Sequence, residues 1–295
     1  MFKNAFLYRV TNRDQGLDAN ACLQSMEFVP CGPTQEKSVG WVPPREANGL
    51  LVEVVGGQCI MKLMTETKAV PAAVVKRSVD RLCDGIERHL GRKPGKKERR
   101  ELKDEALLDL LPKAFPKQSA TMLWYSPSTG LLVIDASTQS KADDAVSALI
   151  KSIDGLALKL INPVQAPASA MAHWLTNMEG PDGFTIDREC ELKACDESKA
   201  VVKYGRHALD IEEVAQHIRT GKMPTKLALT WNDRLSFVLT EGLQIKKIEL
   251  LDATLDQLDR ADDEAHTFDT DVTIFTGEMS KFIPDLLAVM GGEAV

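Results

Sequence analysis

The chain has 295 residues, of which 44% are hydrophobic and 27% charged, a composition that is ordinary for a globular protein of one or two domains. Its apolar runs are too short to span a bilayer, and the first ten residues carry Lys3 and Arg9 in place of the apolar stretch of a signal peptide, so we expect a cytoplasmic protein without a membrane segment. The six cysteines and five histidines are scattered without metal-ligand spacing, which predicts reduced thiols, no metal and no cofactor.

The formal net charge of −7 is concentrated in one part of the chain. Residues 252–271 contain eight acidic residues and a single basic one, Arg260, so this segment accounts for the whole of the net charge. The rest of the chain is neutral overall. An acidic protein of this kind can still bind a polyanion, provided that its basic residues gather locally.

The chain before residue 74 predicts strands with one short helix. Gly56-Gly57 separates two apolar runs and is a strong signal for a β-hairpin. Asp18 is a candidate N-cap for the helix, and the Pro-Cys-Gly-Pro sequence at residues 30–33 follows its end. The expected elements are strands at residues 2–10, 50–55 and 58–66 and a helix at residues 18–28.

A basic helical hairpin is predicted at residues 74–115. This stretch holds 12 Lys and Arg against 8 Asp and Glu, inside an otherwise acidic chain. Apolar residues at helical spacing predict one helix up to Leu90 and a second at residues 96–111, separated by Gly91 and Pro94-Gly95. At a rise of 1.5 Å per residue, the hairpin would project about 25–30 Å.

The remainder of the chain again alternates hairpins with helices. Strands follow one another in pairs joined by turns, and no regular β-α-β units appear, so the fold class is α+β with mainly antiparallel sheet. The expected strands lie at residues 121–125, 131–135, 184–192, 200–204, 227–231, 235–240, 245–251 and 267–275. The expected helices lie at residues 140–153, 172–178, 210–219, 255–265 and 280–290, with a linker at 162–170.

Motifs for nucleotide or nuclease chemistry are weak. The stretch from Gly91 to Lys96 has three residues between its glycines where a phosphate-binding loop has four, and Lys97 stands where that loop has Ser or Thr. Asp135 at a strand end and the acidic segment would suit a metal-dependent nuclease if carboxylates from separate strands converged, which the sequence does not establish. We therefore expect a protein that is not an enzyme.

The basic residues around the hairpin turn are the strongest candidate for a binding site. Lys and Arg neutralise phosphates and release counterions without regard to base sequence. Cations at a helix N-terminus oppose the helix dipole, so helix stability does not account for them. A solvated surface, with Glu98, Glu101 and Asp104 as partial partners, is the competing interpretation. The candidate DNA-binding residues of this region are Arg92, Lys93, Lys96, Lys97, Arg99 and Arg100.

A second basic set lies in the C-terminal half, at Lys203, Arg206 and Lys222, followed by Lys226. Lys222 comes just after a predicted helix, where a cation also suits the helix dipole, so this residue alone is weak evidence. Phe115 ends the hairpin. It would be a contact anchor if exposed and ordinary core if buried, and both possibilities stay open.

Several short phrases together are distinctive. In their order and spacing they resemble the bacterial recombination-associated RdgC family nearly end to end. The phrases are FKNAFLYRV at residues 2–10, PCG at 30–32, GWVPP at 40–44, LKDE at 102–105, LLPKAF at 110–115, CEL at 190–192, TKLALTW at 225–231, TGE at 276–278 and GGE at 291–293.

The resemblance implies a nucleoid-associated, non-enzymatic homodimer that forms a ring around double-stranded DNA without sequence preference and restrains the RecA recombinase. It implies a horseshoe-shaped protomer with Phe115 as a dimer contact and Lys203, Arg206 and Lys222 near the channel. Gly205 and His207 depart from the family pattern, so the second basic run is thinner here. The implied regions are a central one at residues 1–73 and 118–165, a helical tip at 74–117 and a base at 166–295.

Two other functions remain open from the sequence. The acidic segment 252–271 could mimic DNA, which would make the chain a protein-interaction regulator that contacts the recombinase directly. A nuclease or nucleotide-using enzyme is the third hypothesis.

Overall fold

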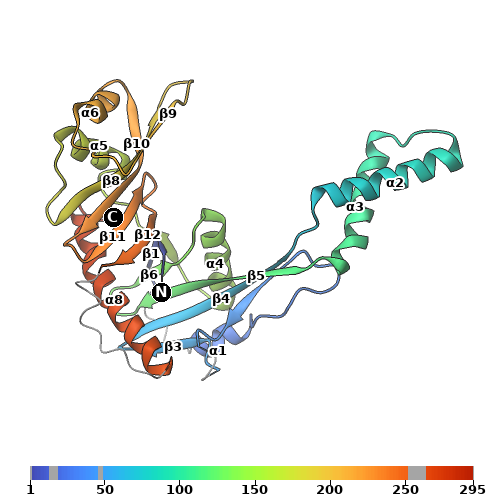
Figure 1. The fold of residues 1–295 in the computed structure, drawn as a ribbon. Helices are drawn as coiled ribbons and strands as arrows, with labels where there is room; N and C mark the ends of the chain where they lie inside the picture. The colour runs from blue at the N-terminus through green and yellow to red at the C-terminus, as the bar shows by residue number, and fades with distance from the viewer. Residues whose placement is uncertain (1, 13–18, 46–48, 252–263, 295) are drawn as a thin grey trace.

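The computed structural model describes residues 2–12, 19–45, 49–251 and 264–294. Its named strands pair antiparallel and its helices pack on the sheet, which confirms the expected α+β class (Figure 1). The strands of this part of the chain are β1 (Asn4–Val10), β2 (Lys37–Val42), β3 (Val52–Val55), β4 (Gln58–Lys68), β5 (Pro116–Ser126), β6 (Leu131–Ile134), β7 (Leu158–Leu160), β8 (Phe184–Ala194), β9 (Val201–Gly205), β10 (Lys222–Trp231), β11 (Leu235–Thr240) and β12 (Ile245–Leu250). The helices are α1 (Ala19–Gln24), α2 (Ala72–Leu90), α3 (Lys96–Leu110), α4 (Gln139–Ser152), α5 (Pro167–Asn177), α6 (Glu212–Arg219), α8 (Glu264–Ala288) and the short 3-10 helix η1 (Leu111–Lys113).

The described strands join in one sheet of two halves. The order is β2-β4-β5-β6-β1-β12-β11-β10-β8-β9, with β3 on β4 and β7 on β1. The first strand links the halves, because Asn4 and Ala5 of β1 pair with Lys246 and Ile245 of β12 while the rest of β1 pairs with β6. The N-terminal strand therefore belongs to both halves of the molecule.

The helical hairpin is inserted between two long neighbouring strands. The β4–β5 ladder continues to the pair Lys68 and Pro116, so the chain leaves for α2 and returns from α3 at adjacent points. Figure 1 shows α2 and α3 standing apart from the rest of the sheet at the end of this ribbon. The predicted end of the first helix at Leu90 and start of the second at Lys96 are confirmed.

The C-terminal region differs from the expectation. The strand predicted at residues 267–275 is wrong, because these residues lie within the single helix α8. Phe268, Val272 and Phe275 are spaced by four and three residues, which places them on one helical face. Val272 and Phe275 are buried. The apparent alternation that suggested a strand was a sampling of this helical period.

The largest core lies between the sheet and the C-terminal helix. Phe275 of α8 stacks on Phe2 with ring centroids 4.8 Å apart, and it meets Trp124 edge-on at 6.4 Å. One turn further on the same face, Phe282 packs against Phe237 of β11 at 4.8 Å. One helix thus covers strands from both halves of the sheet. A second core lies under α4 and α1, on the opposite face of the first half.

The remaining differences are local. The helix predicted at residues 18–28 ends at Gln24, and Glu27 forms a bridge with Trp41 instead; its candidate cap Asp18 lies outside the described residues. Gly40 passes so close to Phe28 that a Cβ would be 2.4 Å from the Phe28 Cα, so a larger residue does not fit there. Most of the helix expected at 255–265 also lies outside the described residues. The division into central, tip and base regions stays a prediction.

Among the helices that the structure describes, none combines the length and the apolar character needed to cross a membrane.

Candidate nucleic-acid interface

The hairpin turn is built by glycine and by a carboxylate at the start of α3. Gly91 ends α2 with a φ of 65°, a left-handed conformation that glycine adopts without steric cost, and its N–H donates to the Glu87 carbonyl. Glu98 lies in the first turn of α3, where its side chain accepts from the Gly95 N–H at 3.4 Å. A carboxylate there offsets the helix dipole and leaves the neighbouring cations directed to solvent.

The six predicted basic residues of the turn divide into two groups. Three of them pair with carboxylates: Arg92 with Glu98 at 2.8 Å, Arg99 with Asp80 at 3.1 Å and Lys93 with Glu87 at 3.9 Å. The hydrogen bond from Arg92 lowers the pKa of the Glu98 carboxyl. The other three, Lys96, Lys97 and Arg100, are exposed and have no ion pair within the described part of the chain. These three carry the positive excess that a polyanion would meet.

The competing interpretation of a solvated, paired surface therefore fits only half of the set. Of the three carboxylates expected as partners, Glu98 pairs with Arg92, whereas Glu101 and Asp104 form no ion pair among the described residues. Exposed pairs of this kind contribute little free energy, so a phosphate can compete for Arg92 and Arg99 as well.

An apolar groove runs along the side of the hairpin. It has a volume of about 550 Å³ or slightly less, at ≈ 520 Å³, and its floor is formed by Val70, Val75, Val79 and Leu107. The Arg99–Asp80 pair lies at its rim. The hairpin has a small core of its own, in which only Val75, Val79 and Ala106 are fully buried. The groove thus leaves apolar surface in contact with water.

Phe115 is 93% exposed, which settles the alternative left by the sequence in favour of an exposed side chain. It lies between η1 and β5, where the hairpin rejoins the sheet. An exposed phenylalanine is unfavourable in water and is typical of a contact residue.

The second basic set lies at the other end of the protomer. Lys203 is on β9, Arg206 follows β9 with a φ of 57°, and Lys222 begins β10. Figure 1 shows these strands far from α2 and α3, so one protomer does not bring the two basic sets together. The Lys222 Nζ lies 3.1 Å from His217 Nδ1, and Arg206 is exposed without an ion pair in the described part of the chain.

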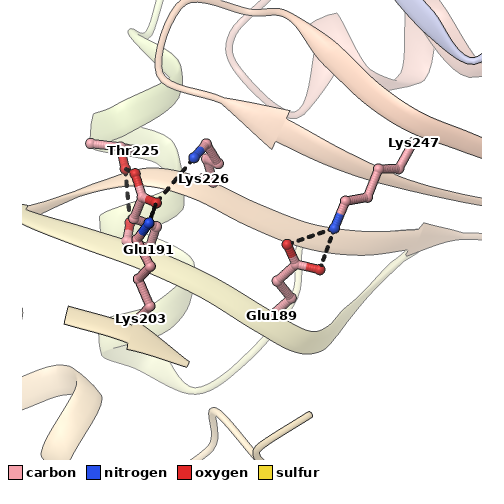
Figure 2. Close-up of polar contacts among 6 residues, drawn as sticks. All are labelled: Glu189, Glu191, Lys203, Thr225, Lys226 and Lys247. Atoms are coloured by element: carbon pink, nitrogen blue, oxygen red, sulfur yellow. Dashed lines mark hydrogen bonds and ion pairs between the residues drawn. The ribbon is translucent and has the colours of Figure 1, made fainter. Parts of the chain in front are cut away.

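Lys203 belongs to a charged cluster on the outward face of the sheet (Figure 2). The Glu191 carboxylate of β8 receives Lys203 from β9 at 3.1 Å and Lys226 from β10 at 3.0 Å, and Thr225 Oγ1 donates to it at 2.8 Å. Burial raises the pKa of the Glu191 carboxyl, but the hydrogen bonds from Lys226, Thr225 and Lys203 outweigh burial and lower this pKa to about 2. Glu191 is therefore ionised at any physiological pH.

A second ion pair crosses the same face. Lys247 of β12 donates to both oxygens of Glu189 on β8, at 2.8 and 2.7 Å (Figure 2). The sequence analysis missed Lys247 and both glutamates, because their partners lie 58 and 35 residues away. The available signal was the alternation of Asp187, Glu189 and Glu191, which places three carboxylates on one face of a strand.

Asp135 has a structural role. Its Oδ1 accepts from the backbone N–H of Asn4 at 2.9 Å and of Lys3 at 3.3 Å, and from the Asn4 side chain at 3.3 Å. These bonds tie the start of β1 to the end of β6. Within the described residues, no three His, Cys, Asp or Glu side chains are grouped as a metal-binding set. Most of the acidic segment 252–271 lies outside those residues, while its Asp269 pairs with Arg45 at 2.9 Å.

A family model described as "Putative exonuclease, RdgC" matches residues 1–293. The chain belongs to the RdgC family. A relative from Herminiimonas arsenicoxydans, named recombination-associated protein RdgC, is 41% identical over 99% of this chain and 98% of its own length. A relative of the same name from Cupriavidus necator is 43% identical over 94% of this chain and 92% of its own length, and one from Bordetella pertussis is 40% identical over 99% and 98%.

The RdgC resemblance drawn from the sequence phrases is thus confirmed over the whole chain. The naming of the relatives supports a role in recombination. The description of the family model points to an exonuclease, whereas the relatives' names mention no enzymatic activity.

Proposed function

We propose that this RdgC protein binds double-stranded DNA without sequence preference, as a homodimer whose protomers surround the duplex, and that it thereby restrains RecA at the nucleoid. The observation that carries the proposal is the group of Lys96, Lys97 and Arg100, exposed and without ion pairs in the described part of the chain. Such charges attract the phosphate backbone and read no base sequence, so binding depends on salt and not on sequence.

A homodimer would close through the hairpin. Phe115 is the apolar side chain most exposed on this arm, and the groove of Val70, Val75, Val79 and Leu107 is an apolar site on the same arm. In a two-fold dimer each protomer offers both partners, so the Phe115 of one chain can enter the groove of the other and the contact is made twice. An aromatic ring buries ~150–250 Å² in such a site, which suits it to anchor an interface.

DNA binding is tested by titrating two fluorescent duplexes of equal length and unrelated sequence with the protein at several salt concentrations. We expect equal affinities for the two duplexes and a steep loss of affinity as salt rises. A strong preference for one duplex, or an affinity that does not respond to salt, would overturn the proposal.

The dimer contact is tested by sedimentation of Phe115→Ala. Truncating a central anchor typically costs 2 kcal/mol or more, so the dimer dissociation constant should rise about 30-fold. Ala72→Phe, which fills the groove from its exposed edge, should weaken the dimer in the same way. Leu90→Ala is the control, because Leu90 is 62% exposed at the other end of the hairpin. Equal effects from Leu90 and Phe115 would count against the groove.

The absence of catalysis in this proposal is tested directly against the exonuclease description. End-labelled duplex and single-stranded DNA are incubated with the protein and Mg²⁺ or Mn²⁺, and we expect no shortening. Progressive loss of nucleotides that copurifies with the protein through a salt gradient would establish the enzymatic function instead.

Restraint of RecA is tested in a strand-exchange reaction. We expect inhibition that disappears in parallel with DNA affinity when the hairpin cations are removed. Inhibition that survives the loss of DNA binding would indicate a direct contact with the recombinase.

A further inference from the structure

The outward face of β8 holds its lysine neighbours in fixed positions. Lys203 is directly opposite Glu191 in the β8–β9 ladder, and Lys226 is directly opposite it in the β8–β10 ladder. The ammonium groups of these two lysines converge on one atom, Glu191 Oε2, at 3.1 and 3.0 Å. Two positive charges thus share one negative charge (Figure 2). This arrangement has the charge and geometry of a site for a singly charged oxyanion, with a carboxylate in place of the ligand.

The exposure of the side chains shows which of them a ligand can reach. Lys203 is 71% exposed and Lys226 is 40% exposed, whereas the Glu191 carboxylate between them is 19% exposed. The lysines therefore remain open to an approaching anion, while the carboxylate lies deeper in the face. A phosphodiester carries the same single charge and presents equivalent oxygens, so it is the class of ligand that fits.

Glu189 is brought to the same face by an irregularity in β8. Leu227 pairs with Cys190 and Leu229 pairs with Ile186, so that residues 187–189 of β8 stand opposite the single residue 228 of β10. This bulge gives Glu189 the freedom to meet Lys247. Both partners of that pair are largely exposed, at 46% and 66%, and exposed ion pairs are easily exchanged for other ions.

We propose that Glu189 and Glu191 act as internal substitutes for DNA phosphates, so that Lys203, Lys226 and Lys247 bind a phosphodiester only by releasing a carboxylate. This inference rests on the proposed DNA-binding function. It assigns Lys226 and Lys247 to the DNA-binding face and gives the two glutamates a weakening role. Because every phosphate contact here is gained at the loss of an internal one, binding at this face is weak and reversible, which suits a protein that surrounds DNA without fixing its position.

The inference is tested with Glu191→Gln and Glu189→Gln, which keep the side-chain shape and remove one negative charge each. Lysines freed in this way release roughly 0.9 counterion per phosphate that they neutralise, so affinity for duplex DNA should rise about three- to tenfold near 0.1 M salt for either variant, with a steeper salt dependence. The gain should disappear in the double variant Glu191→Gln with Lys226→Gln.

Glu36→Gln is the matched control, because Glu36 is exposed, forms no ion pair among the described residues and removes the same charge. A gain of equal size in Glu36→Gln would show a general charge effect and overturn the inference. Unchanged or weaker binding by folded Glu189→Gln and Glu191→Gln would overturn it as well. Glu189 is exposed enough that its variant should fold even if Glu191→Gln does not. If the unchanged protein binds no DNA, the proposed function itself fails, and this outcome is distinct from the other two.

Discussion

Replacing Lys96, Lys97 and Arg100 together by Gln should remove a countable part of the DNA affinity. The three side chains are exposed, and no carboxylate of the described chain pairs with them, so each is available to neutralise one phosphate. The slope of log affinity against log salt changes by about 0.9 for each phosphate contact. The three substitutions should therefore reduce that slope by about 2.7 for each protomer that contacts the duplex.

The same relation gives the loss of affinity at fixed salt. Between 1 M salt, where the electrostatic contribution vanishes, and 0.1 M salt, three contacts amount to about 2.7 powers of ten, or roughly 500-fold. This figure is an upper limit, because a charge that lies away from the duplex contributes less. The assay is fluorescence anisotropy of a labelled duplex over a salt series, with circular dichroism to show that the hairpin is still helical.

The matched control is the triple replacement of Lys141, Lys151 and Lys159 by Gln. These lysines are exposed on α4 and β7, and they form no ion pair within the described part of the chain. The control changes the net charge equally and should leave the slope nearly unchanged. If the hairpin variant keeps the full slope, or if both triple variants lose the same amount, the hairpin does not carry the phosphate contacts and the reasoning is refuted.

Three further predictions concern stability. Arg234→Ala should lower the free energy of unfolding by about 2–3 kcal/mol in urea titrations, because it leaves the buried Glu278 carboxylate without the 2.7 Å bond to Arg234; a change below the error of the fit would contradict this. Ser152→Ala should cost about 1–3 kcal/mol in the same assay, because the buried Trp41 indole N–H loses its acceptor at 2.8 Å, and no loss would mean that the indole finds another. The Glu191 carboxyl has a pKa of about 2, below its ordinary value of 4.5, so its contribution to stability is present above pH 4.5 and is lost as pH falls toward 2. Glu191→Gln should lose less stability than the unchanged protein between pH 5 and about 2, and parallel pH profiles would show that Glu191 is not the group responsible.

The helical hairpin was predictable because its ends are specified locally. Gly91 adopts the left-handed conformation that ends α2, and Lys96 begins α3 after Gly95, so residue types alone place both boundaries. The Gly56-Gly57 turn was likewise readable, and both glycines have positive φ values of 56° and 78°. Local backbone preference determines such positions, and tertiary packing has little to override.

The strand predicted at residues 267–275 failed for a complementary reason. Apolar residues at positions 268, 272 and 274 satisfy both a period of two and a period of 3.6, and only the packing of Phe275 on Phe2 selects the helix. The ion pairs of Glu189 and Glu191 were also out of reach, because they depend on which strands become neighbours. The sheet places β9 and β10 on either side of β8, and the sequence separation of these strands carries no trace of that order.

The contact between Phe2 and Phe275 has a consequence for synthesis of the protein on the ribosome. β1 finds its partner β12, and Phe2 its partner in α8, only after almost the whole chain has been made. At roughly 5–20 residues per second, the N-terminal strand waits about 15–55 s with its apolar face uncovered. During that time it is a target for chaperones and for strands of other nascent chains, and the first half of the molecule cannot complete its fold ahead of the last.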